Sequence, residues 1–250
     1  MAKNTRILEV NQVYKSFRNR GAELKVLEDI SLTVHAGECM ALVGPSGCGK
    51  TTLLNMISGL VAPDQGHLEQ RTDLRLAYVF QEPRLLPWKT VGANISFVQE
   101  NFLSATEAKV IRENLLQKTG LQAYQEVYPA QLSGGMKQRL EMVRALSIKP
   151  ELLLMDEPFK SLDIALQYQL QELILAEQAR ERFALFFITH DPREAVMLAD
   201  RVIVLSDKPA RIHQELVIGV PRAERRITDE TIYGKTEQIL EFLLNGERLK

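Results

Sequence analysis

The chain has 250 residues, a length that suits one large domain, or a core with a subdomain, and that can bury a sizeable hydrophobic core. Hydrophobic residues make up 45%, charged residues 25%, and the net charge of −1 argues against a general nucleic-acid-binding surface. The two cysteines are too few for a disulfide framework, so we expect a reducing compartment. The longest apolar run, 183–188, is far below the about 20 residues of a membrane-spanning helix, and the N-terminus lacks the apolar region of a secretory signal.

The first part of the chain alternates between apolar and polar residues or runs apolar in short bursts. This pattern predicts strands at 6–17, 26–34 and 39–44, with turns at 19–24 and 35–38. A helix is predicted within 49–60 from its apolar spacing, and a short strand at 74–80.

From Val91 to about Ile148 the pattern is helical almost throughout. Strands return afterwards, separated by helical stretches, and this order predicts a mostly parallel sheet with the helical part as an insertion. An amphipathic segment at 236–250 is expected to pack on the core rather than to form a regulatory domain. The later strands are predicted at 151–156, 183–190 and 200–207, and the later helices at 164–180 and 192–198.

The segment GPSGCGKTT matches the phosphate-binding pattern G-x-x-x-x-G-K-[ST], and it has an apolar strand before it and an amphipathic helix after it. Glycines let backbone N–H groups turn toward phosphates, and the helix N-terminus favours an anion. Lys50 would place its charge on the β- and γ-phosphates, and the Thr51 hydroxyl is a hard ligand for Mg²⁺. A chance glycine-rich turn is the alternative. The expected phosphate-binding residues are Gly44, Pro45, Ser46, Gly47, Cys48, Gly49, Lys50, Thr51 and Thr52.

Cys48 lies inside this loop, near a helix N-terminus, and such a position lowers the pKa of a thiol. A reactive Cys48 would be alkylated with loss of activity, and MgATP would protect it. The alternative is a small filler residue whose side chain points away from the ligand. The sequence leaves both interpretations open.

The segment LLLMDEP ends an apolar run with Asp156 and Glu157. In open α/β sheets, ligands bind at the carboxyl ends of the strands. Asp156 would then hold Mg²⁺ through water, and Glu157 would polarise the water that attacks a γ-phosphate. The alternative is an acidic helix N-terminus, in which Pro158 suits the first turn. The presence of the phosphate loop favours the catalytic interpretation.

The segment FFITHDP ends another apolar run at His190. This strand end is of the same kind as the one that carries Glu157, so the imidazole could contact the γ-phosphate or the attacking water. A lone histidine can equally be structural or simply exposed. Asp191 could orient the imidazole or cap the helix that Pro192 begins.

Together, in this order, the motifs resemble those of the ATP-binding subunit of an ABC (ATP-binding cassette) transporter. The resemblance covers the chain up to about Asp207. The segment 44–52 resembles the Walker A motif, LSGGMKQR at 132–139 the signature motif, and LLLMDEP the Walker B motif with its catalytic glutamate. Phe17 resembles the family's aromatic residue that stacks on adenine, and Gln81 resembles its Q-loop glutamine. His190 resembles the switch histidine, and the D-loop is matched by Ser161, Leu162 and Asp163.

The resemblance implies an α/β fold with a P-loop NTPase (RecA-like) core, an antiparallel β-subdomain and an inserted α-helical subdomain. Residues 1–250 would form a single ABC ATP-binding domain, with the core at about 1–88 and 150–250 and the helical subdomain at about 89–149. It further implies an ATPase that uses ATP and Mg²⁺. The implied catalytic residues are Glu157, His190, Gln81 and Lys50, and the implied magnesium ligands are Thr51, Gln81 and Asp156.

The resemblance also implies partners. A second copy would complete a head-to-tail ATP sandwich, in which Ser133, Gly134, Gly135 and Asp163 of one subunit meet the nucleotide held by the other. Transmembrane permease subunits would bind directly, an extracytoplasmic solute-binding protein would act indirectly, and no nucleic acid is expected. The chain would then lie peripherally at the cytoplasmic face of the cell membrane and be soluble when isolated.

The segments 80–88 and 220–226 are similar to those of importers for nitrate, sulfonate, taurine and related solutes. In the first segment, Trp88 could equally pack at a loop edge, and Arg84 could be a solvated charge. Lys160 stands where the family usually has a small residue, close to the expected dimer face. Glu141 also replaces a small or aliphatic residue, so it must be exposed or paired, and Arg144 is available at i+3.

Two other functions compete with transport: a soluble ABC ATPase that acts on DNA or ribosomes, and a P-loop kinase. A soluble ABC ATPase of the DNA-repair type would insert a long coiled coil between the Walker A and signature motifs, whereas Lys50 and Ser133 stand 83 residues apart without sustained heptads. The translation-factor type that acts on ribosomes carries two cassettes in one chain. A P-loop kinase has no use for LSGGMKQR. The leading hypothesis is therefore an ATPase that powers import through a separate permease.

Overall fold

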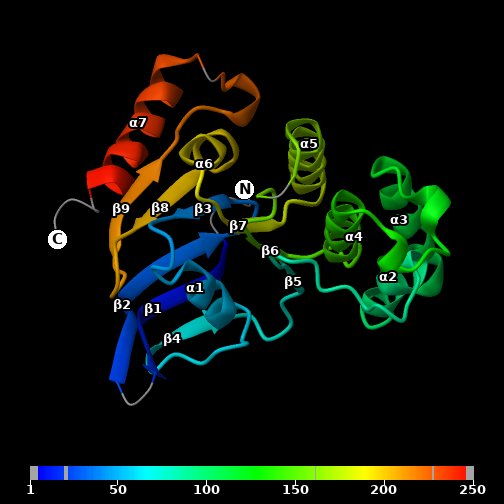
Figure 1. Cartoon of the computed structure of the whole chain (residues 1–250), viewed down its shortest axis with the longest axis horizontal. Coiled ribbons are helices and arrows are strands. Elements are labelled where there is room, and N and C mark those ends of the chain that lie inside the picture. The colour runs from blue at the N-terminus through cyan, green and yellow to red at the C-terminus, as the bar shows by residue number, and fades with distance from the viewer. Residues whose placement is uncertain (1–4, 20–21, 161, 227, 246–250) are drawn as a thin grey trace. The chain divides into compact units, whose positions relative to one another are not determined.

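The computed structural model describes residues 5–19, 22–160, 162–226 and 228–245 (Figure 1). The chain forms two compact units, one made of Met1–Asp73 with Ala184–Lys250 and the other of Leu74–Phe183. Across the residues that the structure describes, every helix is too short or too polar to cross a membrane.

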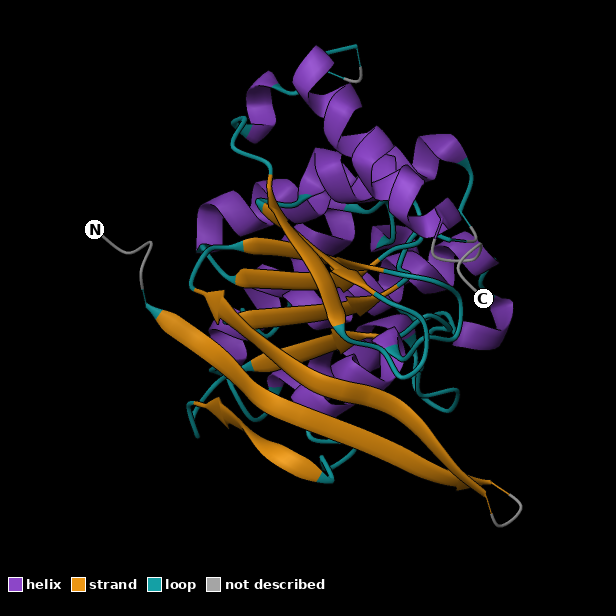
Figure 2. Cartoon of the chain, turned by 90° about the vertical axis from the view of Figure 1, so that its left-hand side faces the viewer, coloured by secondary structure: helices purple, strands orange, loops and turns teal. Residues whose placement is uncertain are grey.

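The first unit contains an antiparallel sheet in the order β2–β1–β4, built on the long β1–β2 hairpin (Figure 2). Alternate residues point into the core, among them Val10 of β1, which pairs with Leu32 of β2 and Leu68 of β4. The expected turn at 19–24 is too long, because Ala22 already pairs with Asn19. The strands are β1 (Arg6–Asn19), β2 (Ala22–His35) and β4 (Gln65–Gln70).

A second set of strands in this unit is mostly parallel. Strand β3 pairs in parallel with β7 and β8, and β9 pairs antiparallel with β8. All five residues of both β3 and β7 are buried, as expected for strands that are covered on both faces. Helix α1 follows β3, and α6 follows β7. The elements are β3 (Cys39–Val43), α1 (Lys50–Ile57), β7 (Ala184–Ile188), α6 (Pro192–Leu198), β8 (Arg201–Leu205) and β9 (Ile212–Val217).

The C-terminal helix α7 (Glu230–Asn245) packs beside α6 (Figure 1). Its buried face contains Ile232, Thr236 and Ile239, so the expected packing of the C-terminal segment is confirmed for its described residues. Leu244, which the sequence groups with Ile239, is exposed instead.

The segment 220–226, whose 3-10 turn is η3 (Arg222–Glu224), fixes the end of α6. The buried Arg225 guanidinium donates to the carbonyl oxygens of Val196 and Ala199, both at 2.8 Å. These carbonyls have no partner within the helix, so the cation satisfies them. The Arg222 guanidinium donates to Asp200 at 2.7 Å. The arginines of this segment therefore stabilise the helix that follows His190.

The second unit contains a parallel strand pair and a group of helices (Figure 1). Helices α2, α3 and α4 contact one another, and α4 also contacts β5 and α5. In the described part of this unit, each α-helix begins after a Ser, Thr or Asp whose side chain accepts a backbone N–H of the first turn, which explains where these helices start. The elements are β5 (Leu76–Val79), α2 (Val91–Gln99), α3 (Ala105–Lys118), η1 (Gln122–Tyr124), η2 (Pro129–Gln131), α4 (Gly134–Leu146), β6 (Leu152–Asp156) and α5 (Ile164–Glu181).

Candidate functional site

The phosphate loop of the first unit turns sharply between β3 and α1. Gly47 and Gly49 have φ values of 73° and 130°, which favour glycine. A Cβ at Gly49 would also lie 2.8 Å from the side chains of Val26 and Leu27, so only glycine fits there. The turn leads directly into the N-terminus of α1, whose free N–H groups suit an anion. Ser46, Gly47 and Thr51 are exposed on this loop.

The Lys50 ammonium lies within the phosphate loop. It donates to the carbonyl oxygens of Gly44 and Pro45, both at 2.8 Å, and the residue is buried. A cation held by uncharged carbonyls keeps its full charge for an incoming anion. The structure therefore places the positive charge and the helix N-terminus on one loop, as a phosphate site requires.

Cys48 is buried in the same loop, and a Cβ at Gly44 would lie 3.1 Å from its sulfur. Burial raises the pKa of the Cys48 thiol, and the nearby Lys50 charge only partly opposes this shift. The prediction of a lowered thiol pKa was therefore wrong, because loss of solvent outweighs the field of the helix N-terminus.

We expect Cys48 to resist alkylation in the native protein. With Cys39 replaced by serine, iodoacetamide at pH 8 should leave Cys48 unmodified over a time in which the same variant in urea reacts completely. The reason is that alkylation needs an accessible thiolate, and burial disfavours that form. Mass spectrometry of the intact protein measures the modified fraction. Rapid labelling of the folded variant that MgATP suppresses would support the reactive thiol instead.

Phe17 lies on β1 and its ring is partly exposed. The Lys15 ammonium lies 5.5 Å from the ring centroid and is also bonded to Asp64 at 2.6 Å. An accessible ring face of this kind can stack on a purine base. Phe17 belongs to the same unit as the phosphate loop.

His190 follows β7 and is exposed. The Asp191 carboxylate accepts the backbone N–H of Arg193 at 2.8 Å, so it caps α6. The backbone N–H of Asp191 donates to the hydroxyl of Thr189 at 3.0 Å. Of the two roles considered for Asp191, the structure shows the cap.

Asp156 and Glu157 stand at the carboxyl end of β6 in the second unit. Asp156 is buried, and the pKa of Tyr78 on the neighbouring strand β5 is raised mainly by the burial of Tyr78 and further by the Asp156 charge. Glu157 has φ 44°, an unusual value for a residue with a side chain, and such outliers occur often at functional sites. The alternative of an acidic helix start was wrong, because α5 begins only at Ile164.

Residues 157–160 form a turn instead. The N–H of Lys160 donates to the carbonyl of Glu157 at 3.3 Å, and the Lys160 ammonium lies 2.6 Å from Glu157 Oε2. The buried amide of Gln138 on α4 donates to the carbonyl of Pro158 at 2.9 Å. Gln138 belongs to the LSGGMKQR segment, but no role was predicted for it. Its contact with Pro158 depends on its burial, which the sequence of the motif does not reveal.

The segment after β5 carries Gln81, which is exposed. The rings of Tyr78 and Phe80 stack at 4.1 Å, and the Arg84 guanidinium lies 3.9 Å from the Phe80 centroid. Arg84 is therefore packed on an aromatic ring rather than simply solvated. The packing alternative for Trp88 was wrong, because its side chain is 70% exposed.

Ser133 caps α4, which begins at Gly134. Its hydroxyl accepts the N–H of Met136 at 3.3 Å, and both Ser133 and Gly134 are exposed. A Cβ at Gly135 would lie 2.7 Å from Leu166. Asp163 caps α5 through the N–H of Leu166 at 3.0 Å. Ser161, assigned to the D-loop, lies outside the described residues.

Glu141 is buried on α4 and pairs with Arg144 at 2.9 Å, which confirms the expected pairing. Burial raises the pKa of Glu141, while the charges of Arg144 and Arg84 oppose the shift. The pair lines a groove of about 280 Å³, together with Leu76, Ala77, Tyr78, Phe97, Val98, Asn101, Phe102, Ala145 and Ile148.

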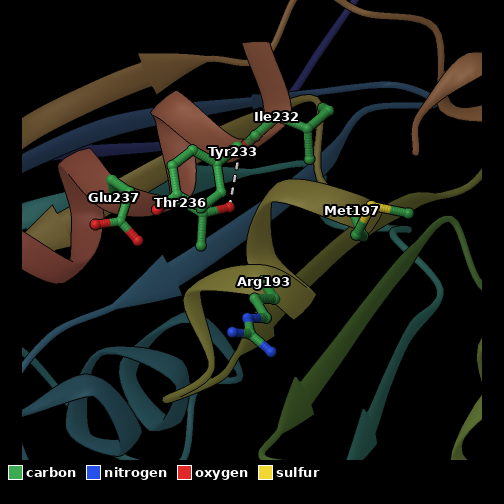
Figure 3. Close-up of a pocket in the computed structure, with 6 residues that line it drawn as sticks. All are labelled: Arg193, Met197, Ile232, Tyr233, Thr236 and Glu237. Atoms are coloured by element: carbon green, nitrogen blue, oxygen red, sulfur yellow. Dashed lines mark hydrogen bonds between the residues drawn. The ribbon is translucent and has the colours of Figure 1, made fainter. Parts of the chain in front are cut away.

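A smaller cavity of about 170 Å³ lies between α6 and α7 (Figure 3). The Thr236 hydroxyl in its wall donates to the carbonyl of Ile232 at 2.8 Å, so it is already satisfied within its own helix. None of the residues predicted for the site lines this cavity. Its lining residues are Arg193, Met197, Ile232, Tyr233, Thr236 and Glu237.

The predicted site residues thus divide between the two units. The phosphate loop, Phe17 and His190 belong to the first, and Gln81, Ser133, Gly134, Gly135, Asp156, Glu157 and Asp163 belong to the second.

The family model "ABC transporter" matches residues 27–160. The aliphatic sulfonates import ATP-binding protein SsuB 2 of Pseudomonas syringae pv. tomato is 42% identical, over 80% of this chain and 85% of that protein. The nitrate import ATP-binding protein NrtC of Synechococcus elongatus is 38% identical, over 97% of this chain and 39% of that protein. A solved dimer of the ATP-binding cassette MJ0796 with ADP and Pi has a TM-score of 0.76 at 25% identity, over 86% of this chain and all of that one.

Proposed function

The chain belongs to the family of ABC transporter ATP-binding cassettes, and from this premise we propose that it is the ATP-hydrolysing subunit of an importer for nitrate-, sulfonate- or taurine-type small solutes. As a member of the family it binds and hydrolyses ATP. The observation that supports the solute class is the 42% identity to a sulfonate importer subunit over most of both chains. The subunit would act peripherally at the cytoplasmic face of the membrane.

The triphosphate would lie against the phosphate loop, with the Lys50 ammonium on its β- and γ-phosphates and the adenine on Phe17. Glu157 would accept the proton of the attacking water, and His190 would contact the γ-phosphate. Mg²⁺, when bound, would neutralise phosphate charge. The hydroxyl of Thr51, the amide oxygen of Gln81 and the buried carboxylate of Asp156 are hard oxygen donors that fit this ion.

A second copy of the chain would complete each site. Ser133 and Gly134 expose the N-terminus of α4, which could meet a phosphate held by the partner. On α5, Ile164 is 74% exposed and Tyr168, one turn later, is 56% exposed. These exposed side chains support the proposal that the second copy covers the surface near Asp163. Two of the solved structures that the chain resembles are dimers.

A permease subunit would bind the groove of the second unit. Phe97 and Phe102 line it and are still about half exposed, and the ammonium of Lys89, the residue after Trp88, lies 5.4 Å from the Phe97 ring centroid. Exposed aromatic side chains are typical of interaction surfaces. A helix of the permease with apolar residues would fill this groove.

The test uses affinity purification of the tagged subunit from solubilised membranes of the cells that express it, with the co-purified proteins identified by mass spectrometry. The wild-type chain should co-purify with the permease. Phe97→Asp should lose the permease and keep ATP hydrolysis by the isolated subunit, because an acidic group opposes burial of the groove. Val110→Asp is the matched control, since Val110 is 62% exposed on α3 outside the groove. Recovery with ribosomes or nucleic acid instead of a permease would contradict the proposal.

A further inference from the structure

Lys160 and Glu157 form a close pair within one turn. The Lys160 ammonium lies 2.6 Å from Glu157 Oε2, and the N–H of Lys160 closes the turn on the carbonyl of Glu157. Both contacts lie within residues 157–160 of the same chain, and Glu157 adopts a positive φ of 44° in this turn. The pair is therefore set by local geometry and needs no partner chain.

The ammonium lies at one of the two carboxylate oxygens through which Glu157 could take a proton from water. A base acts on a water within about 2.6–3.2 Å of its oxygen. In this structure Glu157 Oε2 is buried, and the ammonium lies against it at that distance. A water can take this position on Oε2 only after the ammonium has moved away.

The side chain of Lys160 can move while the turn stays in place. Its exposed fraction is 46%, and ion pairs with an exposed partner are weak. The turn itself is held by Gln138, whose buried amide donates to the carbonyl of Pro158. The lysine side chain is thus the mobile partner, and Glu157 the fixed one.

We propose that Lys160 is a latch on the general base: in the resting subunit its ammonium occupies Glu157, and hydrolysis requires its displacement. The inference rests on the proposed function, which assigns the base role to Glu157. Lys160 is then a positioning residue that restrains basal turnover, and it does not contribute to ATP binding.

The experiment measures kcat and KM for ATP hydrolysis by the isolated subunit. Lys160→Met should raise kcat about twofold to fivefold, the range that a weak ion pair allows, with KM unchanged. Lys160→Arg should keep the wild-type kcat, because a guanidinium can form the same ion pair with Glu157. Lys109→Met is the control, since Lys109 is an exposed lysine of the same unit that pairs with Glu113.

The same change in a Glu157→Gln background isolates the role of the pair. Lys160→Met should have no effect there, because the latch acts only through the carboxylate. An unchanged or lower kcat in Lys160→Met alone, or an equal rise in both backgrounds, would overturn the proposal. Full activity of Glu157→Gln by itself would instead reject the base assignment on which the proposal rests.

Discussion

Replacing Glu157 with glutamine is expected to lower kcat for ATP hydrolysis about 10²- to 10⁴-fold, the usual contribution of a general base, while ATP affinity stays close to wild type. The amide has the shape of the carboxylate but accepts no proton from water. Glutamine also tolerates the same turn, so the effect should not arise from misfolding. With ATP bound and not hydrolysed, the variant should accumulate as a dimer.

Three measurements check this result: phosphate release, ATP binding by calorimetry, and the oligomeric state by light scattering with and without MgATP. Glu172→Gln is the matched control, because Glu172 is an exposed glutamate of α5 outside the candidate site. The control should hydrolyse ATP at the wild-type rate. If Glu157→Gln hydrolysed ATP equally fast, another group would have to be the base.

Buried apolar strands and well-capped helices could be predicted from the sequence. Strands β3 and β7 are continuous apolar runs, β6 is apolar up to its last residue Asp156, and all residues of the three strands are buried. Helix α6 has the predicted bounds, because Asp191 caps it and Pro192 starts it. Strands β4 and β9 were missed, since β4 has only one large apolar residue, Leu68, and the polar residues 213–215 interrupt the apolar residues of β9.

The sequence predicts the candidate site as a set of positions, and it does not predict the local environment of each position. A helix N-terminus in the sequence suggested a lower pKa for the Cys48 thiol, and only the three-dimensional packing revealed its burial. The positive φ of Glu157 carries no sequence signal, because the residue is not glycine, and its pairing with Lys160 was not predicted either. The burial of Gln138 and the exposure of Trp88 likewise depend on how these residues pack against other parts of the fold.

Replacing Ser133 with arginine is expected to spare ATP binding by the single subunit and to abolish ATP-dependent dimerisation and turnover. Ser133 is exposed at the start of α4, where a partner's γ-phosphate would approach, so a long side chain blocks that approach. Loss of donors to a transition-state oxyanion lowers turnover about 10²- to 10³-fold, and we expect a loss of at least this size. Calorimetry measures binding, and light scattering in the Glu157→Gln background measures dimerisation.

Ser104→Arg separates the interface effect from loss of the helix cap. Ser104 is also exposed, and its hydroxyl accepts the N–H of Glu107 at 3.3 Å, the same distance as the bond from Met136 to Ser133. Both variants lose one cap, worth about 1 kcal/mol, so their stabilities should fall alike. Only Ser133→Arg should lose the dimer, because Ser104 caps α3, away from the signature motif. Weaker ATP binding by monomeric Ser133→Arg would mean that the signature motif serves its own nucleotide, and equal loss of turnover in Ser104→Arg would attribute the effect to stability.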